Sequence, residues 1–167
     1  MKTVNHLFSS QKRFATFLQK NSIDATKEHF VQVFMRNNDP VELENVLKII
    51  HNDLPSSSLI GTSTAGEILE GGMQDNTTVI SISTFEATKV KTELIEGDSE
   101  DEIAIKVTSL ISSNTKLVLV FNNVYSNDGE LLLDSLEKKL PDNITIARSE
   151  ERRVGKECRS RWPPYPQ

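Results

Sequence analysis

The sequence predicts an α/β domain with a mixed β-sheet and flanking helices. Between residues 29 and 147, apolar strands alternate with amphipathic helices, which is the pattern of parallel strand–helix–strand crossovers. Two further apolar stretches, 77–85 and 89–96, are separated by three residues and predict an antiparallel hairpin. The chain has 167 residues, of which 37% are hydrophobic and 26% charged, and this size and composition fit one globular domain.

The first half begins with a short amphipathic helix over residues 11–20 and a strand rich in Val and Phe over residues 29–35. Asp39 is a good N-cap, and Pro40 suits the first turn of the helix that follows. That helix leads into a short strand near 58–61 and then into a Gly-rich, turn-like segment. The proposed hairpin comes next.

The second half repeats the alternation. Gly97-Asp98-Ser99 starts a helix whose acidic first turn suits the positive end of the helix dipole. Residues 116–123, KLVLVFNN, are a continuous apolar run, as in a strand covered on both faces. Asn127-Asp128-Gly129 opens the next helix, and residues 143–147, NITIA, form the last strand of the predicted domain.

Composition excludes several classes of function. A net charge of −5 excludes a chain-wide basic face for nucleic acid. One cysteine excludes a disulfide framework and a Cys-rich zinc site. The histidines at 6, 29 and 51 lack ligand spacing, so we expect no metal and no cofactor. No apolar run approaches the roughly 20 residues of a membrane helix, and the start has no secretory signal, so we expect a cytoplasmic protein.

The last twenty residues, 148–167, differ in composition from the rest of the chain. They hold five of its seven arginines, its only Cys and its only Trp, and their net charge is +3 against −8 for residues 1–147. The string EERRVGKECRSRW resembles a translated adapter or vector sequence, and the alternative is a basic arm for a polyanion. We therefore expect a domain over 1–147, incomplete at its carboxyl end, followed by a non-native tail over 148–167.

The segment richest in possible chemistry is GTSTAGEILEGG, residues 61–72, directly after a strand. Glycines at such a place let backbone N–H groups approach a ligand closely. The spacing from Gly61 to Gly66 is that of a phosphate-binding loop, but the next residue should then be Lys and is Glu67. A carboxylate there repels phosphate, so the sequence excludes nucleotide binding at this loop.

The same segment loosely resembles the nucleophile elbow of hydrolases, with Ser63 as the nucleophile. That order of residues needs a His later in the chain, and all three histidines precede Ser63. The remaining alternative is structural: the hydroxyls of the segment satisfy its own backbone in a turn.

Residues 61–68, GTSTAGEI, also resemble the signature of the FIST (F-box and intracellular signal transduction) domain, which is near G-C-S-T-A-G-E-I. The lead-in HFVQVFMRNNDP and the later run KLVLVFNN fit the same family, and the resemblance covers roughly residues 29–147. Thr62 stands where the family commonly has Cys, so we expect no thiol chemistry there. The family pattern would continue into a Gly-rich stretch and a second FIST half, and the Arg-rich tail begins instead.

The resemblance implies a non-enzymatic sensory domain that binds a small molecule, such as an amino acid, and acts on a downstream signalling output domain or protein. A serine hydrolase using Ser63 and a protein-interaction scaffold are the alternatives. The family has no catalytic residues to transfer to this sequence. Hydroxyls and a carboxylate on a loop at the strand ends suit a small zwitterion. The candidate ligand-binding residues are Gly61, Ser63, Thr64, Gly66, Glu67 and Asn122.

Overall fold

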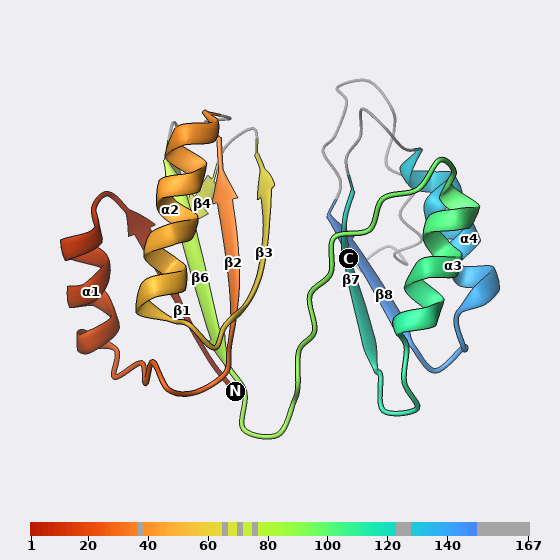
Figure 1. The fold of residues 1–167 in the computed structure, drawn as a ribbon, viewed down its shortest axis with the longest axis horizontal. Coiled ribbons are helices and arrows are strands. Elements are labelled where there is room, and N and C mark those ends of the chain that lie inside the picture. Colours follow the sequence, from red (N-terminus) through yellow and green to blue (C-terminus); the bar gives the residue numbers. More distant parts are fainter. Residues whose placement is uncertain (37–38, 65–66, 70–71, 75–76, 123–127, 150–167) are drawn as a thin grey trace, which may run out of the picture. The chain divides into compact units, whose positions relative to one another are not determined.

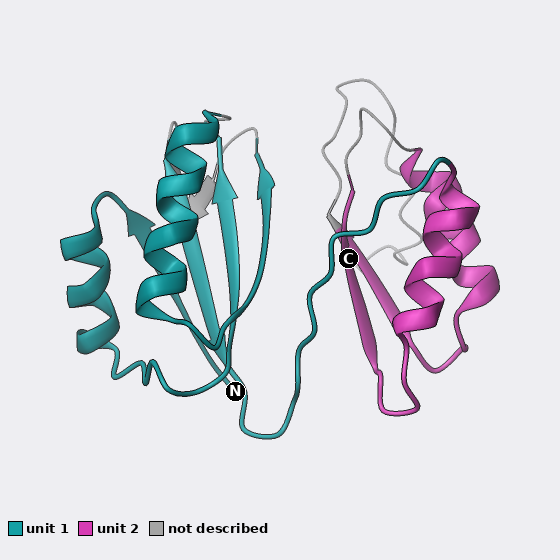
Figure 2. Cartoon of the chain, in the orientation of Figure 1, with its two compact units in different colours: residues 1–98 teal, residues 99–167 magenta. Residues whose placement is uncertain are grey.

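The computed structural model describes the backbone of residues 1–36, 39–64, 67–69, 72–74, 77–122 and 128–149. The chain forms two compact units, Met1–Asp98 and Ser99 onwards, which are coloured separately in Figure 2. No helix within the described residues is both long enough and apolar enough to cross a membrane. We describe each unit by itself.

Unit 1 is built on a four-stranded mixed sheet (Figure 1). The strand order is β1-β6-β2-β3, in which β2 and β3 are parallel and β6 runs antiparallel to both of its neighbours. The elements of unit 1 are β1 (Lys2–Phe8), α1 (Gln11–Lys20), β2 (His29–Met35), α2 (Pro40–Asp53), β3 (Ser58–Ser63), β4 (Glu67–Leu69), β5 (Gly72–Gln74) and β6 (Thr78–Thr84).

Both helices of unit 1 begin at caps that the sequence provides. The side chain of Ser10 accepts a hydrogen bond from Arg13 N, and that of Asp39 accepts one from Val41 N, so one backbone donor at each helix start is satisfied. Pro40 occupies the first turn of α2, as predicted. These observations confirm the helices predicted after residue 10 and after Asp39.

The core of unit 1 lies between the two helices and one face of the sheet. Alternate residues of β2 are buried, and they pack with the apolar faces of α1 and α2. Figure 1 shows α2 lying across this sheet face. The buried members of the core are Phe14, Leu18, Val31, Val33, Met35, Val46, Ile49, Ile50, Leu54, Ile80 and Ile82.

The predicted hairpin between 77–85 and 89–96 is wrong. Residues 89–96 form no strand, although 78–84 do. Both edges of β6 are already hydrogen-bonded, to β1 on one side and to β2 on the other. Strand β1, which we did not predict, therefore provides the antiparallel pairing that we had assigned to 89–96.

The Gly-rich segment is less loop-like than the sequence suggested. Strand β3 continues to Ser63, and β4 and β5 form an antiparallel ladder in which Glu67 lies opposite Gln74. The described residues of the predicted turn-rich segment 61–72 therefore lie mostly in extended backbone. Gly66 lies outside the described residues, and so do the side chains of β4.

The described residues of unit 2 form two parallel strands and two helices. The elements are α3 (Glu100–Leu110), β7 (Leu117–Phe121), α4 (Gly129–Lys139) and β8 (Thr145–Ser149), and β7 pairs with β8. Ser99 caps α3 and Asp128 caps α4, as the sequence indicated. The expectation that the 116–123 strand is covered on both faces is wrong within this unit, because Leu117 is 56% exposed and the rest of β7 is half-buried.

The predicted fold class is confirmed. Parallel pairs joined by helices occur twice, as β2–α2–β3 and β7–α4–β8, and β1 and β6 add the antiparallel part. The chain is therefore an α/β protein with a mixed sheet and flanking helices.

Candidate functional site

The carboxyl ends of β2 and β3 bring the FIST-like signature to one edge of the sheet. The two strands are in parallel register, with Met35 opposite Ser63. Thr64 N donates a hydrogen bond of 3.0 Å to Met35 O, so the ladder extends one residue beyond β3. The hydroxyls of Ser63 and Thr64 are therefore held on ordered backbone at the edge where open α/β sheets bind ligands.

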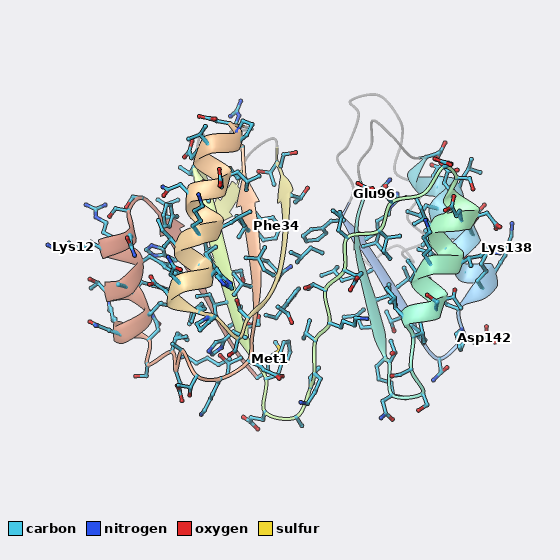
Figure 3. The ribbon with its side chains drawn as sticks, viewed as in Figure 1. Met1, Lys12, Phe34, Glu96, Lys138 and Asp142 are labelled. Atoms are coloured by element: carbon cyan, nitrogen blue, oxygen red, sulfur yellow. The ribbon has the colours of Figure 1, made fainter. Side chains whose placement is uncertain are left out.

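These two hydroxyl side chains differ in exposure. Ser63 is exposed to solvent, whereas Thr64 is half-buried. Ser63 shares a sheet face with Gly61, and Thr62 points to the opposite face beside Phe34, which Figure 3 labels. Thr62 Oγ1 donates to Ser63 O at 3.1 Å, so this side chain is engaged with its own strand.

Gly61 lies inside β3 and has a packing reason to be Gly. A Cβ built on it would lie 3.1 Å from Val33 O and 3.4 Å from Val33 Cβ. Val33 O belongs to the neighbouring strand and cannot move aside without disturbing the sheet. The sequence predicted that glycines here let a ligand approach closely, and at Gly61 the structure shows a close approach by β2.

The three remaining predicted site residues are Gly66, Glu67 and Asn122, and the structure describes only part of their surroundings. Glu67 begins β4 three residues after Thr64, and its side chain lies outside the described part of the structure, as does Gly66. Asn122 follows β7 in unit 2 and is half-buried. Its Nδ2 lies 3.3 Å from the position of a Cβ on Gly129, at the start of α4.

The histidines lie away from Ser63. His29 begins β2, so the length of the strand separates it from Met35 and Ser63, about 20 Å at 3.3 Å per residue. His51 is in the last turn of α2, before β3 begins. His6 packs against α1, with its ring centroid 4.5 Å from that of Phe17.

A shallow cavity of about 180 Å³ opens at the other end of the sheet of unit 1. Its lining includes Lys2, Asp24, His29 and Thr84, and neither Ser63 nor Thr64 belongs to it. His29 is 3% exposed, and its ring lies between two partners, since its Nε2 is 2.8 Å from Asp24 O and its Nδ1 is 2.9 Å from Thr84 Oγ1. The carbonyl only accepts, so Nε2–H donates to it and Nδ1 accepts from the hydroxyl in the neutral ring.

Sequence reasoning missed this cavity because its residues come from β1, the turn after α1 and the end of β6. Lys2, Asp24 and Thr84 share no spacing in the sequence. Only the alternation of Val4, His6 and Phe8 could have identified β1 and so this end of the sheet. The described residues contain no cluster of three or more His, Cys, Asp or Glu side chains that could hold a metal ion.

A comparison with protein families matches the FIST N domain to residues 29–147, more than two thirds of the chain. The chain belongs to the FIST N domain family. The boundaries of the match are those expected from the signature and its flanking strands. FIST domains are sensor-type domains of signal-transduction proteins, so the sensory class of function follows from membership. A search of curated proteins and a search of solved structures found no match.

Proposed function

We propose that this FIST domain senses a small zwitterion, such as an amino acid, at the carboxyl ends of β2 and β3 without transforming it. The observation that carries the proposal is the placement of Ser63 and Thr64, whose hydroxyls follow a parallel strand pair within the family signature. Clefts outside the carboxyl ends of such strands are the usual ligand sites of open α/β sheets.

The chemistry of the segment suits both charges of an amino acid. A hydroxyl donates a hydrogen bond to a ligand carboxylate, and a carboxylate such as that of Glu67 accepts from an ammonium group. Binding without hydrolysis is supported by the histidines, since His29 and His51 lie toward the opposite ends of their elements and neither stands beside Ser63 as a general base. We further propose a cytoplasmic location and a downstream signalling partner.

Calorimetric titration of the full chain against a panel of amino acids tests this proposal. Losing one charge-assisted hydrogen bond costs about 1.5–3 kcal/mol, so Glu67→Gln should weaken binding by roughly ten- to a hundred-fold. Ser63→Ala should weaken it less, because a hydrogen bond between neutral groups contributes about 0.5–1.5 kcal/mol. Thermal melts of each variant provide the folding control.

Two substitutions serve as matched controls. Glu44→Gln removes an exposed carboxylate from α2, whose ion pair with Lys48 is solvent-exposed and contributes little to stability. Ser56→Ala removes an exposed hydroxyl before the amino end of β3. Neither control should change affinity for an amino acid.

Three results would contradict the proposal in different ways. If Glu67→Gln lowers the melting temperature strongly and leaves affinity unchanged, Glu67 is structural. If the parent chain hydrolyses an ester or amide and Ser63→Ala abolishes that activity, the chain is a hydrolase. If no amino acid binds and a protein partner is lost in the Ser63 and Glu67 variants, the segment is a protein-interaction surface.

A further inference from the structure

The segment after β6 has the side-chain pattern of a strand over part of its length but forms no strand. Residues 85–98 contain no helix or strand, yet residues 89–94 (KVKTEL) alternate charged and uncharged side chains. Val90 and Thr92 are half-buried, and the intervening Lys91 and Glu93 are exposed. The alternation then fails at Leu94, which is 89% exposed. The exposure of residues 90–93 therefore alternates as it does in a strand that lies against a sheet, and the exposure of Leu94 breaks that pattern.

The strand that this segment approaches is β3. Ser58 Oγ, at the first residue of β3, donates a hydrogen bond of 3.0 Å to Val90 O. Figure 1 shows the segment leaving β6 and rising on the β3 side of the sheet. Strand β3 is an edge of the four-stranded sheet. Within unit 1, β3 is thus the edge strand that contacts this segment.

The edge strand β3 also lacks charged side chains that would protect it from pairing with another strand. No charged residue occurs from Pro55 to Gly66, whereas the opposite edge strand, β1, carries Lys2. Exposed edge strands are usually protected by charge, Pro or a bulge, because their backbone groups otherwise recruit another strand. An uncharged edge strand beside a segment with strand-like alternation fits a segment that can pair with β3 and separate from it again.

We propose that residues 89–96 close onto β3 as a fifth, parallel strand that forms one wall of the ligand site. The direction follows from β6, which is antiparallel to β2, so a chain that reverses once after β6 runs parallel to β3. The hydrogen bond from Ser58 Oγ to Val90 O brings these two residues together, and we take them as the register pair. Counting equal steps along both strands places Leu94 beside Thr62 and Glu96 beside Thr64.

This register gives the closed segment a chemical role. Leu94 would leave water, and Glu96 would come beside Thr64, on the sheet face opposite to that of Ser63. A second carboxylate at that place would accept hydrogen bonds from the ammonium group of an amino acid. This role rests on the function proposed above, whereas the closure itself does not.

Disulfide trapping in the full chain tests the closure without a ligand. In a Cys158→Ser background, Thr62→Cys with Leu94→Cys places both thiols in register, and Thr62→Cys with Thr92→Cys places them two residues apart. Neighbouring residues of paired strands are about 4.8 Å apart, which a disulfide spans, whereas a two-residue offset exceeds its limit of about 7 Å. We expect the in-register pair to oxidise at least about ten-fold faster than the offset pair. Equal rates, or a faster offset pair, would overturn the closure.

Amide hydrogen exchange of the otherwise unchanged chain covers the case in which a cysteine pair fails to fold. Closure predicts that residues 90–96 exchange more slowly in the parent than in Leu94→Asp, because a buried carboxylate opposes docking. Identical exchange in the two chains would contradict it. If the in-register disulfide forms and the locked chain binds no amino acid, the proposed function fails and the closure stands. If the locked chain binds one and Glu96→Gln leaves affinity unchanged, Glu96 does not contact the ligand.

Discussion

His6 is an ionisable residue placed in an aromatic environment. Its ring stacks on Phe17, with the centroids 4.5 Å apart, and lies 5.7 Å from that of Phe14. Its buried Nε2 has no hydrogen-bond partner in the part of the chain that the structure describes. Burial disfavours the charged ring and lowers the pKa of His6 below its ordinary value of 6.5.

This environment predicts an acid-sensitive contribution to stability. Because the pKa of His6 is lower in the folded state, the contribution is fully present above about pH 6.5 and is lost as the pH falls through the folded-state pKa. His6→Phe keeps an aromatic ring and removes the titration. We expect urea unfolding at pH 8 and pH 5 to show a smaller loss of unfolding free energy in the variant than in the parent.

His51, which is exposed on α2, provides the matched control, and His51→Phe should retain the acid loss of the parent. Asp24 titrates in a separate window. Hydrogen bonds from the side chain and backbone of Thr26 hold the pKa of Asp24 below its ordinary value of 3.8, so its contribution is lost only in stronger acid. An equal acid loss in the parent and in His6→Phe would remove His6 as the cause.

Gly61 provides a second prediction at the residue scale. A Cβ at this position would lie 3.1 Å from Val33 O, and the branched side chain of Val would crowd β2 further. Overpacking of this kind costs about 1–3 kcal/mol, so Gly61→Val should lower the free energy of unfolding by that amount despite the good strand propensity of Val. Thr62→Val, one residue along β3, is the control and should have a much smaller effect. Chemical denaturation measures both, and an unchanged midpoint for Gly61→Val would show that β2 can shift.

At the scale of elements, local signals predicted the helices well and strand pairing poorly. The caps at Asp39, Ser99 and Asp128 each satisfy backbone donors of the helix that follows, so helix starts are encoded within a few residues. Strand partners are set by contacts distant in sequence. The 89–96 stretch has strand alternation, but β1, some seventy residues earlier than β6, occupies the edge that the predicted hairpin required.

The end of α1 shows an element closed by an unusual residue. Ile23 N donates to Leu18 O and Ser22 N donates to Gln19 O, both at 3.0 Å, which is the Schellman arrangement of a helix C-terminus. Ser22 takes the left-handed position, with φ of 55°, where Gly is usual.

Replacing this residue should stabilise the chain. The left-handed conformation costs a residue with a Cβ about 1–2 kcal/mol, which Gly avoids. Gly also has more conformational freedom in the unfolded chain, and this offsets about 0.4–1 kcal/mol of the stabilisation. Ser22→Gly should therefore raise the free energy of unfolding by roughly 0.5–1 kcal/mol, and Ser22→Ala, which keeps a Cβ, should not raise it. Thermal unfolding of the two variants makes the comparison, and a lower melting temperature for Ser22→Gly would contradict the assignment of strain.

At the scale of the whole molecule, the sequence predicted the family region and the α/β class, since the FIST N domain match covers residues 29–147. It also predicted that the signature lies at the end of a strand, which Ser63 and Thr64 confirm. It did not predict that Gly61 lies inside a strand and packs against β2. The residues of one strand do not show which other strand will pair with it. Nor did it indicate two compact units.

The two units differ in how their sheets are protected, and this predicts unequal hydrogen exchange. In unit 1 the central strands β2 and β6 are hydrogen-bonded on both edges, and eleven buried residues of its described part form the core. In unit 2, β7 and β8 form a two-stranded sheet, and two strands alone are marginally stable. We expect amides of β7 to exchange faster than those of β2.

A core substitution in unit 2 sharpens this expectation. Leu136, on α4, is 1% exposed, and truncating a buried Leu to Ala costs about 2–5 kcal/mol. Leu136→Ala should accelerate exchange in β7 and α4 and leave β2 and β6 near their parent rates, because the core of unit 1 is formed by its own residues. Ile82→Ala, at a fully buried position of β6, is the reciprocal variant and should accelerate exchange in unit 1. Equal acceleration in both units by either substitution would show that the chain opens as a single cooperative unit.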